Sequence, residues 1–171
     1  MPTLITIIGG ETCNSYCTLA EADQILDERL STDAWRDAVP DDRERALIMA
    51  ARRLDQELWL GDRVKTTQRL AWPRIGVEKR DPAGIGYGDF VISTSLDWYP
   101  SDAIPELIKQ AQVLLALAYL EGFRETGERI REHSMDGLTV KKDFERSGLA
   151  LPVEVQQLID GLALGGQLQR G

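Results

Sequence analysis

The chain has 171 residues with 28 acidic and 20 basic side chains, which gives a formal net charge of −8 at pH 7. With 43% hydrophobic and 28% charged residues it has the composition of a folded globular protein, so one domain over residues 1–171 is expected and wholesale disorder is not. The acidic balance argues against a protein whose task is to hold nucleic acid, because phosphate binding relies on Lys and Arg side chains that displace counterions.

The sequence offers few ligands for a metal and no export signal. Cys13 and Cys17 are the only cysteines and His133 is the only histidine, so neither a zinc site nor a disulfide is expected. The N-terminus lacks a basic stretch, and its apolar run is too short for a signal peptide. We therefore expect no metal, no cofactor, no membrane contact, and synthesis in the cytoplasm.

The first elements are an N-terminal arm over residues 1–12 and a helix. Within the arm, the β-branched run at residues 3–8 predicts a short strand with no neighbouring hairpin partner, so its partner must be distant or on another chain. Thr18 and Glu21 have the spacing of a capping box, which predicts a helix from there to about Leu30. Its apolar stripe comprises Leu19, Ala22, Ile25, Leu26 and Leu30.

One helical turn around Trp35 is expected next, and Pro40 opens a helix that extends to about Leu58. Four arginines on this helix are compatible with a phosphate-binding patch, but the acids interleaved among them favour a solvated, salt-bridged face. The apolar positions of the helix are Leu47, Ala50, Ala51, Leu54 and Leu58, and its arginines are Arg43, Arg45, Arg52 and Arg53.

Residues 59–100 show no helical pattern and are rich in Gly and Pro, which predicts a long central loop of the kind that is functional or ordered by a partner. Trp72, which precedes Pro73, is predicted to anchor this loop to the core. Residues 84–88 resemble a phosphate-binding loop but lack its Gly-Lys-Ser/Thr ending, so a plain loop is expected. The tryptophans predicted to be structural anchors are Trp72, Trp35 and Trp59, and Trp98 is also expected in the core.

The helix predicted over residues 105–122 is the one around which the rest is organised. Pro105 fits its first turn and Gly122 fits a left-handed stop, while the apolar residues between them cover most sides. Polar side chains interrupt the run, which favours a buried core helix over a membrane span. The polar positions expected to face water in its first turns are Glu106, Lys109, Gln110 and Gln112.

Near the C-terminus, an Asp-Gly pair between β-prone residues predicts a small β element at residues 134–144. Pro152 then starts a last helix, and residues 164–171 form a flexible tail. The predicted fold is thus mainly α, a compact bundle of about four helices. The sequence contains no catalytic motif, and His133 is read as a solvent-exposed residue rather than a base, so an enzyme is not expected.

Residues 14–23 (NSYCTLAEAD) and 68–74 (QRLAWPR), with the late Gly137–Val140, give the chain a family resemblance over most of its length. It resembles the head–tail connector or adaptor proteins of the tailed-bacteriophage neck, which are often labelled DnaT-like single-stranded-DNA-binding proteins. The Gly-rich stretch at residues 81–94 is an insertion relative to that pattern.

The resemblance implies a structural virion protein in the neck, made in the host cytoplasm and assembled as a homo-oligomeric ring of twelve copies. The ring would join the portal protein to a tail or nozzle protein, and genome DNA would pass through without specific binding. The residues expected to contact partners are Leu4, Ile5 and Ile7 in the arm and Val155, Leu158, Ile159 and Leu162 in the last helix. The alternative, a DnaT-like single-stranded-DNA-binding protein, requires a basic groove with stacking aromatic side chains.

Overall fold

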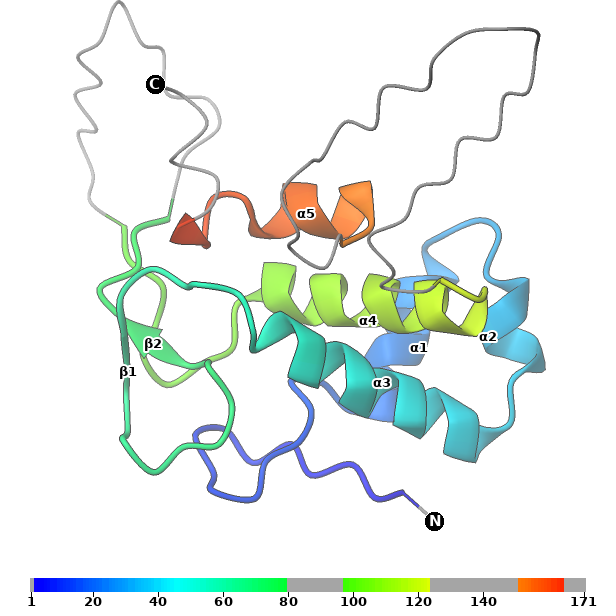
Figure 1. The fold of residues 1–171 in the computed structure, drawn as a ribbon, viewed down its shortest axis with the longest axis horizontal. Helices are drawn as coiled ribbons and strands as arrows, with labels where there is room; N and C mark the ends of the chain where they lie inside the picture. Colours follow the sequence, from blue (N-terminus) through cyan, green and yellow to red (C-terminus); the bar gives the residue numbers. More distant parts are fainter. Residues whose placement is uncertain (1, 80–96, 124–150, 165–171) are drawn as a thin grey trace, which may run out of the picture.

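The computed structural model describes residues 2–79, 97–123 and 151–164. In these residues the chain forms five helices and one two-stranded antiparallel sheet, so the predicted mainly α fold is confirmed (Figure 1). The elements in order are α1 (Leu19–Asp27), α2 (Asp33–Asp37), α3 (Pro40–Leu54), β1 (Asp62–Arg63), β2 (Arg74–Ile75), α4 (Glu106–Leu120) and α5 (Val153–Ile159). Several predictions lie outside the described residues. They concern the β element at residues 134–144, the exposed His133, the Gly-rich stretch at 81–94 and the tail at 165–171.

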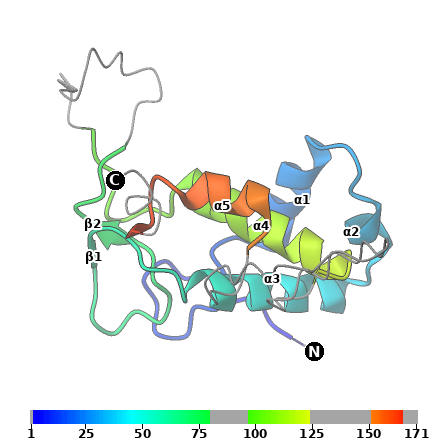
Figure 2. The same ribbon diagram turned by 45° about the horizontal axis from the view of Figure 1, so that its top comes forward.

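Helix α4 lies at the centre, between α3 and α5, and it also contacts α1 and α2 (Figure 1 and Figure 2). Pro105 immediately precedes its first residue, and Gly122 follows its end with a φ of +89°, a conformation that glycine adopts without strain. The central helix expected from the sequence is therefore confirmed. Its buried apolar residues are Ile108, Ala111, Val113, Leu114, Leu115, Ala116 and Leu117.

Gln112 corrects one part of that expectation, since its side chain is fully buried instead of facing water. Its Oε1 accepts a hydrogen bond from the Tyr16 backbone N–H at 2.9 Å. Its Nε2 donates to Ser15 Oγ at 2.8 Å and to the Leu47 carbonyl at 2.9 Å. A buried amide is tolerated when its donors and acceptors are paired in this way, and this one ties the N-terminal segment and α3 to α4.

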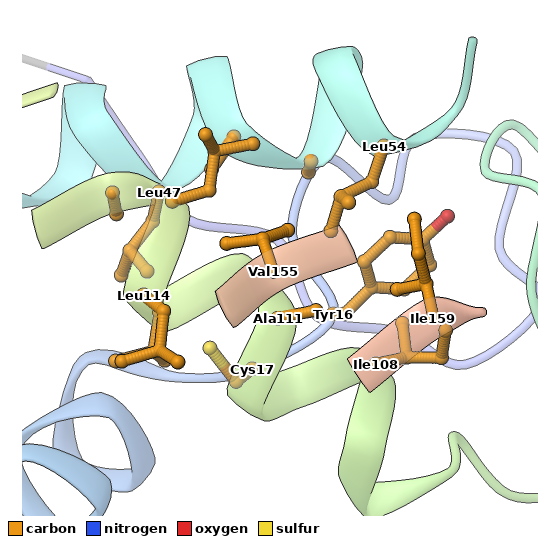
Figure 3. Close-up of a cluster of buried hydrophobic side chains, with 14 of the residues drawn as sticks. Tyr16, Cys17, Leu47, Leu54, Ile108, Ala111, Leu114, Val155 and Ile159 are labelled. Atoms are coloured by element: carbon orange, nitrogen blue, oxygen red, sulfur yellow. The ribbon is translucent and has the colours of Figure 1, made fainter. Parts of the chain in front are cut away.

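The main core forms where α3, α4 and α5 converge with residues 16 and 17 (Figure 3). Leu47 and Leu54 come from α3, Ile108 and Leu114 from α4, and Val155 from α5. No helix within residues 2–79, 97–123 and 151–164 is long and apolar enough to cross a membrane.

The capping box of α1 is confirmed, because Thr18 Oγ1 accepts from the Glu21 N–H while the Glu21 carboxylate accepts from the Thr18 N–H. The helix ends at Asp27, earlier than predicted, and Leu30 is 93% exposed in the turn that follows. That leucine was wrongly assigned to the buried stripe, since the helical periodicity no longer applies beyond the helix end. The predicted turn of helix around Trp35 is present as α2.

Helix α3 begins at Pro40 as predicted but ends at Leu54, so Leu58 is 71% exposed rather than part of the apolar face. Of its arginines, Arg53 departs from the predicted solvated face. Arg53 is buried and forms an ion pair with Glu57 at 2.6 Å, whereas Arg45 pairs with Asp42 at the surface. The helical wheel places Arg53 beside the core, where its aliphatic stem can pack.

The N-terminal arm is extended but contains no β-strand within residues 2–8, which corrects the predicted strand. Its backbone is paired locally through Asn14, whose Oδ1 accepts from the Ile5 N–H at 2.7 Å and whose Nδ2 donates to the Thr3 carbonyl at 2.9 Å. The Asn14 N–H in turn donates to the Ile5 carbonyl. Leu4 packs against the core, so the arm is held by its own chain and no distant partner strand is required.

Three of the four residues predicted to contact partners on the last helix are used in packing, and Leu158 is half-buried. Val155, Ile159 and Leu162 are buried in the core, because α5 packs its apolar stripe on α4. Beyond α5, the Leu60 N–H donates to the Leu162 carbonyl and the Leu164 N–H donates to the Leu58 carbonyl. Val155, Ile159 and Leu162 thus pack within the chain itself, and partner contact through the last helix stays a prediction.

Candidate functional site

The candidate site is formed by the segment that connects α3 to α4 in the chain. This segment contains short antiparallel strand pairings and no helix. Strand β1 pairs with β2, with Asp62 opposite Ile75 and Arg63 opposite Arg74. Further along, the Tyr99 N–H donates to the Val77 carbonyl and the Lys79 N–H to the Asp97 carbonyl. We call residues 62–79 together with residues 97–99 the loop face; it occupies one end of the molecule, at the left of Figure 1.

Trp72 is the residue that fixes the loop face to the helical core. Its indole is 1% exposed, and it meets Trp59 edge-on at 5.8 Å and Tyr99 edge-on at 6.4 Å between ring centroids. The peptide bond from Trp72 to Pro73 is cis. Trp35 and Trp59 are also buried, and their indole N–H groups donate to Asp23 and to the Leu54 carbonyl respectively.

Two polar side chains within the loop face satisfy its backbone. Gln68 is 3% exposed; its Oε1 accepts from the Lys65 N–H, and its Nε2 donates to the carbonyls of Leu70, Ala71 and Pro73. These bonds hold residues 65–73 in a compact turn. No sequence pattern signals this role, because a buried glutamine cannot be told from an exposed one by its identity.

Arg74 has the corresponding role for the preceding turn. Its guanidinium donates to the carbonyl of Leu60 at 2.6 Å and also to the carbonyls of Trp59, Gly61 and Ala71. Burial lowers the pKa of Arg74, and the neighbouring Arg63 acts in the same direction. An arginine remains protonated despite such a shift, so this cation supports the loop from within and is not free to bind a ligand.

The other cations of the loop face point to solvent. Arg63, Lys65 and Arg69 are exposed, and none of the three forms an ion pair with another described residue. Residues 62–79 carry five basic and two acidic side chains, a net charge of +3, and Asp97 reduces the loop face to +2. The protein as a whole carries −8, so its acids lie elsewhere and this surface is locally positive.

Trp98 adds an accessible aromatic ring to the same surface. It lies opposite Glu78 in an isolated β-bridge and is 48% exposed, which corrects its assignment to the core. Next to it, Lys79 forms an ion pair with Asp97 at 2.8 Å and lies 5.9 Å from the centroid of the Tyr99 ring. The loop face thus combines exposed cations with an exposed indole.

A groove of about 700 Å³ between α1, α4 and α5 is the other concave surface of note. Ile25, Leu114 and Leu158 contribute apolar surface to it. Its charged residues are Glu21, Glu28, Glu106, Glu154, Arg29 and Lys109, four acids against two bases. Glu21 contacts Lys109 and Arg29 contacts Glu154, so the excess charge is negative and the groove does not suit a phosphate.

Metal ligands and thiols were the other candidate groups in the described residues. Among them, no group of three or more His, Cys, Asp or Glu side chains could hold a metal ion. Cys13 and Cys17 are both buried, and burial raises the pKa of Cys17 to about 12. Thiols with raised pKa values remain protonated and are poor nucleophiles.

Comparison with known proteins identifies a family for this chain. A family model described as "Putative DnaT-like ssDNA binding protein" matches residues 6–167. No curated protein and no solved structure matches the chain.

This match overturns the connector hypothesis, because the matching family is described by single-stranded DNA binding and not by a place in the phage neck. The expected ring with portal and tail partners was wrong on the same finding, as was the expectation that DNA is not specifically bound. The expectation against DNA binding failed because it was drawn from the net charge, which averages over the whole chain. The net charge hides a loop whose own charge has the opposite sign.

Proposed function

The chain belongs to the DnaT-like single-stranded-DNA-binding family, and from this premise we propose that it binds single-stranded DNA through the loop face. The family match is the observation that carries the proposed activity. The location is argued from the charges and rings of residues 62–79 and 97–99.

Charge supports this location. Binding of a nucleic-acid backbone requires cations that are exposed and not already neutralised, and Arg63, Lys65 and Arg69 meet both conditions among the described residues. The groove between α1, α4 and α5 does not meet these conditions, because both of its cations are ion-paired and its excess charge is negative. The rest of the protein surface is acidic, which limits non-specific binding of DNA, because DNA is attracted only where the local potential is positive.

The exposed ring of Trp98 supports a single strand in preference to a duplex. Unpaired bases stack on aromatic side chains, whereas the bases of a duplex are already stacked on each other. Trp98 is half exposed on the loop face, while Trp35, Trp59 and Trp72 are buried. We therefore assign base stacking to Trp98 and backbone binding to the three exposed cations, a binding role rather than a catalytic one.

The test compares two triple variants by fluorescence anisotropy with a labelled oligothymidylate of 20 nucleotides. Arg63→Gln/Lys65→Gln/Arg69→Gln removes the cations of the loop face. With a slope of about −0.7 per neutralised phosphate, it should lower the salt slope by about 2 and weaken binding at 50 mM salt. The control variant removes the same charge from surface arginines of α2 and α3, namely Arg36→Gln/Arg45→Gln/Arg52→Gln.

The control should bind nearly as the wild type does. Equal weakening by both variants would show that only total charge matters, and would reject the loop face as the site. Failure of the wild type to bind any oligonucleotide at low salt would reject the activity itself.

Trp98 gives a second, charge-neutral test. Trp98→Ala should cost about 1–3 kcal/mol of binding free energy, the usual contribution of one stacked base, while Trp98→Phe retains a ring and should retain most of the affinity. The melting temperature should change little in either variant, because the indole is half exposed. Equal affinities for Ala and Phe variants would remove stacking from the proposal.

A further inference from the structure

Asp55 joins the loop face to the rest of the molecule. It caps the C-terminus of α3, where its backbone N–H donates to the Ala51 carbonyl. Its Oδ1 accepts two hydrogen bonds, one from the Tyr16 hydroxyl and one from the Ala71 N–H at 2.9 Å. One carboxylate oxygen therefore links three segments that are distant in sequence.

Both donors belong to segments that the sequence marked as distinctive. Ala71 immediately precedes the buried Trp72, so the bond from its N–H fixes the loop at its anchor. Tyr16 is 4% exposed, and its own N–H is held by Gln112 of the central helix. Through Tyr16 the carboxylate is connected to the central helix α4.

The negative charge of Asp55 also affects the electrostatic potential of the loop face. Arg63 and Arg69 both interact electrostatically with this carboxylate, and both are among the exposed cations proposed to bind DNA. The other titratable groups that face it are the Tyr16 hydroxyl and the Cys13 thiol. An ionised Asp55 thus offsets part of the positive potential of this surface, and a neutral one does not.

We propose that Asp55 is a positioning residue for the DNA-binding loop, and that loss of its negative charge strengthens DNA binding while its oxygen continues to hold the loop. This inference rests on the proposed function. A protonated carboxyl group or a carboxamide can still accept both hydrogen bonds through one oxygen, so the positioning and the charge are separable.

The protonation equilibrium of the group agrees with this role. Burial raises the pKa of Asp55; hydrogen bonds from Tyr16 and Ala71 and the charges of Arg63 and Arg69 oppose this shift without cancelling it. Asp55 therefore takes up a proton at a higher pH than an ordinary exposed aspartate. DNA binding should strengthen as the pH falls through that range.

The experiment measures oligothymidylate affinity for the wild type, Asp55→Asn and Asp55→Ala. At pH 7 the Asn variant, which keeps the acceptor and loses the charge, should bind about threefold more tightly. The Ala variant loses both, and should bind about fivefold more weakly than the Asn variant because the Ala71 N–H is left without its acceptor. The advantage of the Asn variant should shrink in acid, where wild-type Asp55 itself becomes neutral.

Hydrogen exchange at the Ala71 amide tests positioning without DNA. It should be slow in the wild type and in Asp55→Asn, and fast in Asp55→Ala. Equal exchange in all three would overturn the positioning role. An Asn variant with the affinity and pH profile of the wild type would overturn the charge role. If no variant binds DNA, the proposed function and the charge role both fail, and the Ala71 exchange still decides the positioning role.

Discussion

Replacing Gln112 by Leu tests whether the buried amide holds the fold together. The change keeps the side chain close to its original size but removes every hydrogen bond that the amide makes. The Tyr16 N–H loses its acceptor in a fully buried site, and Ser15 Oγ and the Leu47 carbonyl lose a donor. Ser15, Tyr16 and Leu47 are all buried, so water does not replace the lost bonds.

An orphaned buried N–H costs about 1–3 kcal/mol, and each of the other lost bonds about 1 kcal/mol, while the added apolar surface of Leu offsets a part. We expect a net loss of about 3 kcal/mol in the free energy of unfolding. For a chain of this length, that lowers the melting temperature by roughly 6–12 °C.

Urea denaturation followed by circular dichroism provides the assay, with the midpoint falling and the slope unchanged. Gln110→Leu is the matched control, since it makes the same chemical change two residues earlier at a half-buried position of α4. It should stay within about 0.5 kcal/mol of the wild type. If Gln112→Leu is no more destabilising than this control, the amide network does not stabilise the fold and the reasoning fails.

Three further predictions concern stability. Trp72→Ala should cost about 3–5 kcal/mol and Trp72→Phe distinctly less, because the indole N–H has no hydrogen-bond partner among the described residues; equal melting temperatures would refute the anchor role. Thr18→Ala should cost about 1 kcal/mol by removing the cap of α1, and an unchanged urea midpoint would count against the cap. Burial acts to raise the pKa of Glu21, but hydrogen bonds from Lys109 and Thr18 outweigh it and lower the pKa on balance. The stability that ionised Glu21 contributes is therefore present above the ordinary glutamate pKa and is lost as the pH falls through the lowered pKa. The stability advantage of the wild type over Glu21→Gln should vanish in acid, and an advantage independent of pH would contradict this.

The sequence was sufficient to predict the structural features that depend only on residues adjacent in the chain. The capping box of α1, Pro40 at the start of α3 and Gly122 after α4 follow from local backbone chemistry, which a sequence displays directly. The apolar periodicity of α4 also predicted that this helix is central. These elements do not need knowledge of what lies elsewhere in the chain.

Burial of individual polar and aromatic residues was decided by contacts that are distant in sequence. Gln112 is buried because the N–H of Tyr16, 96 residues earlier, supplies its partner. Trp98 is exposed, whereas its neighbour Tyr99 packs edge-on against the buried Trp72. Neither environment can be deduced from the identity of the residue alone.

The same distinction applies to charge. The sequence by itself determined the net charge of −8, the mainly α fold and the positions of the acids and bases along the chain. Only the tertiary structure separated Arg74, which is used by backbone carbonyls inside the loop, from Arg63, Lys65 and Arg69, which remain exposed. The electrostatic potential at a surface depends on which charges lie nearby and which are already paired, and both are properties of the folded chain.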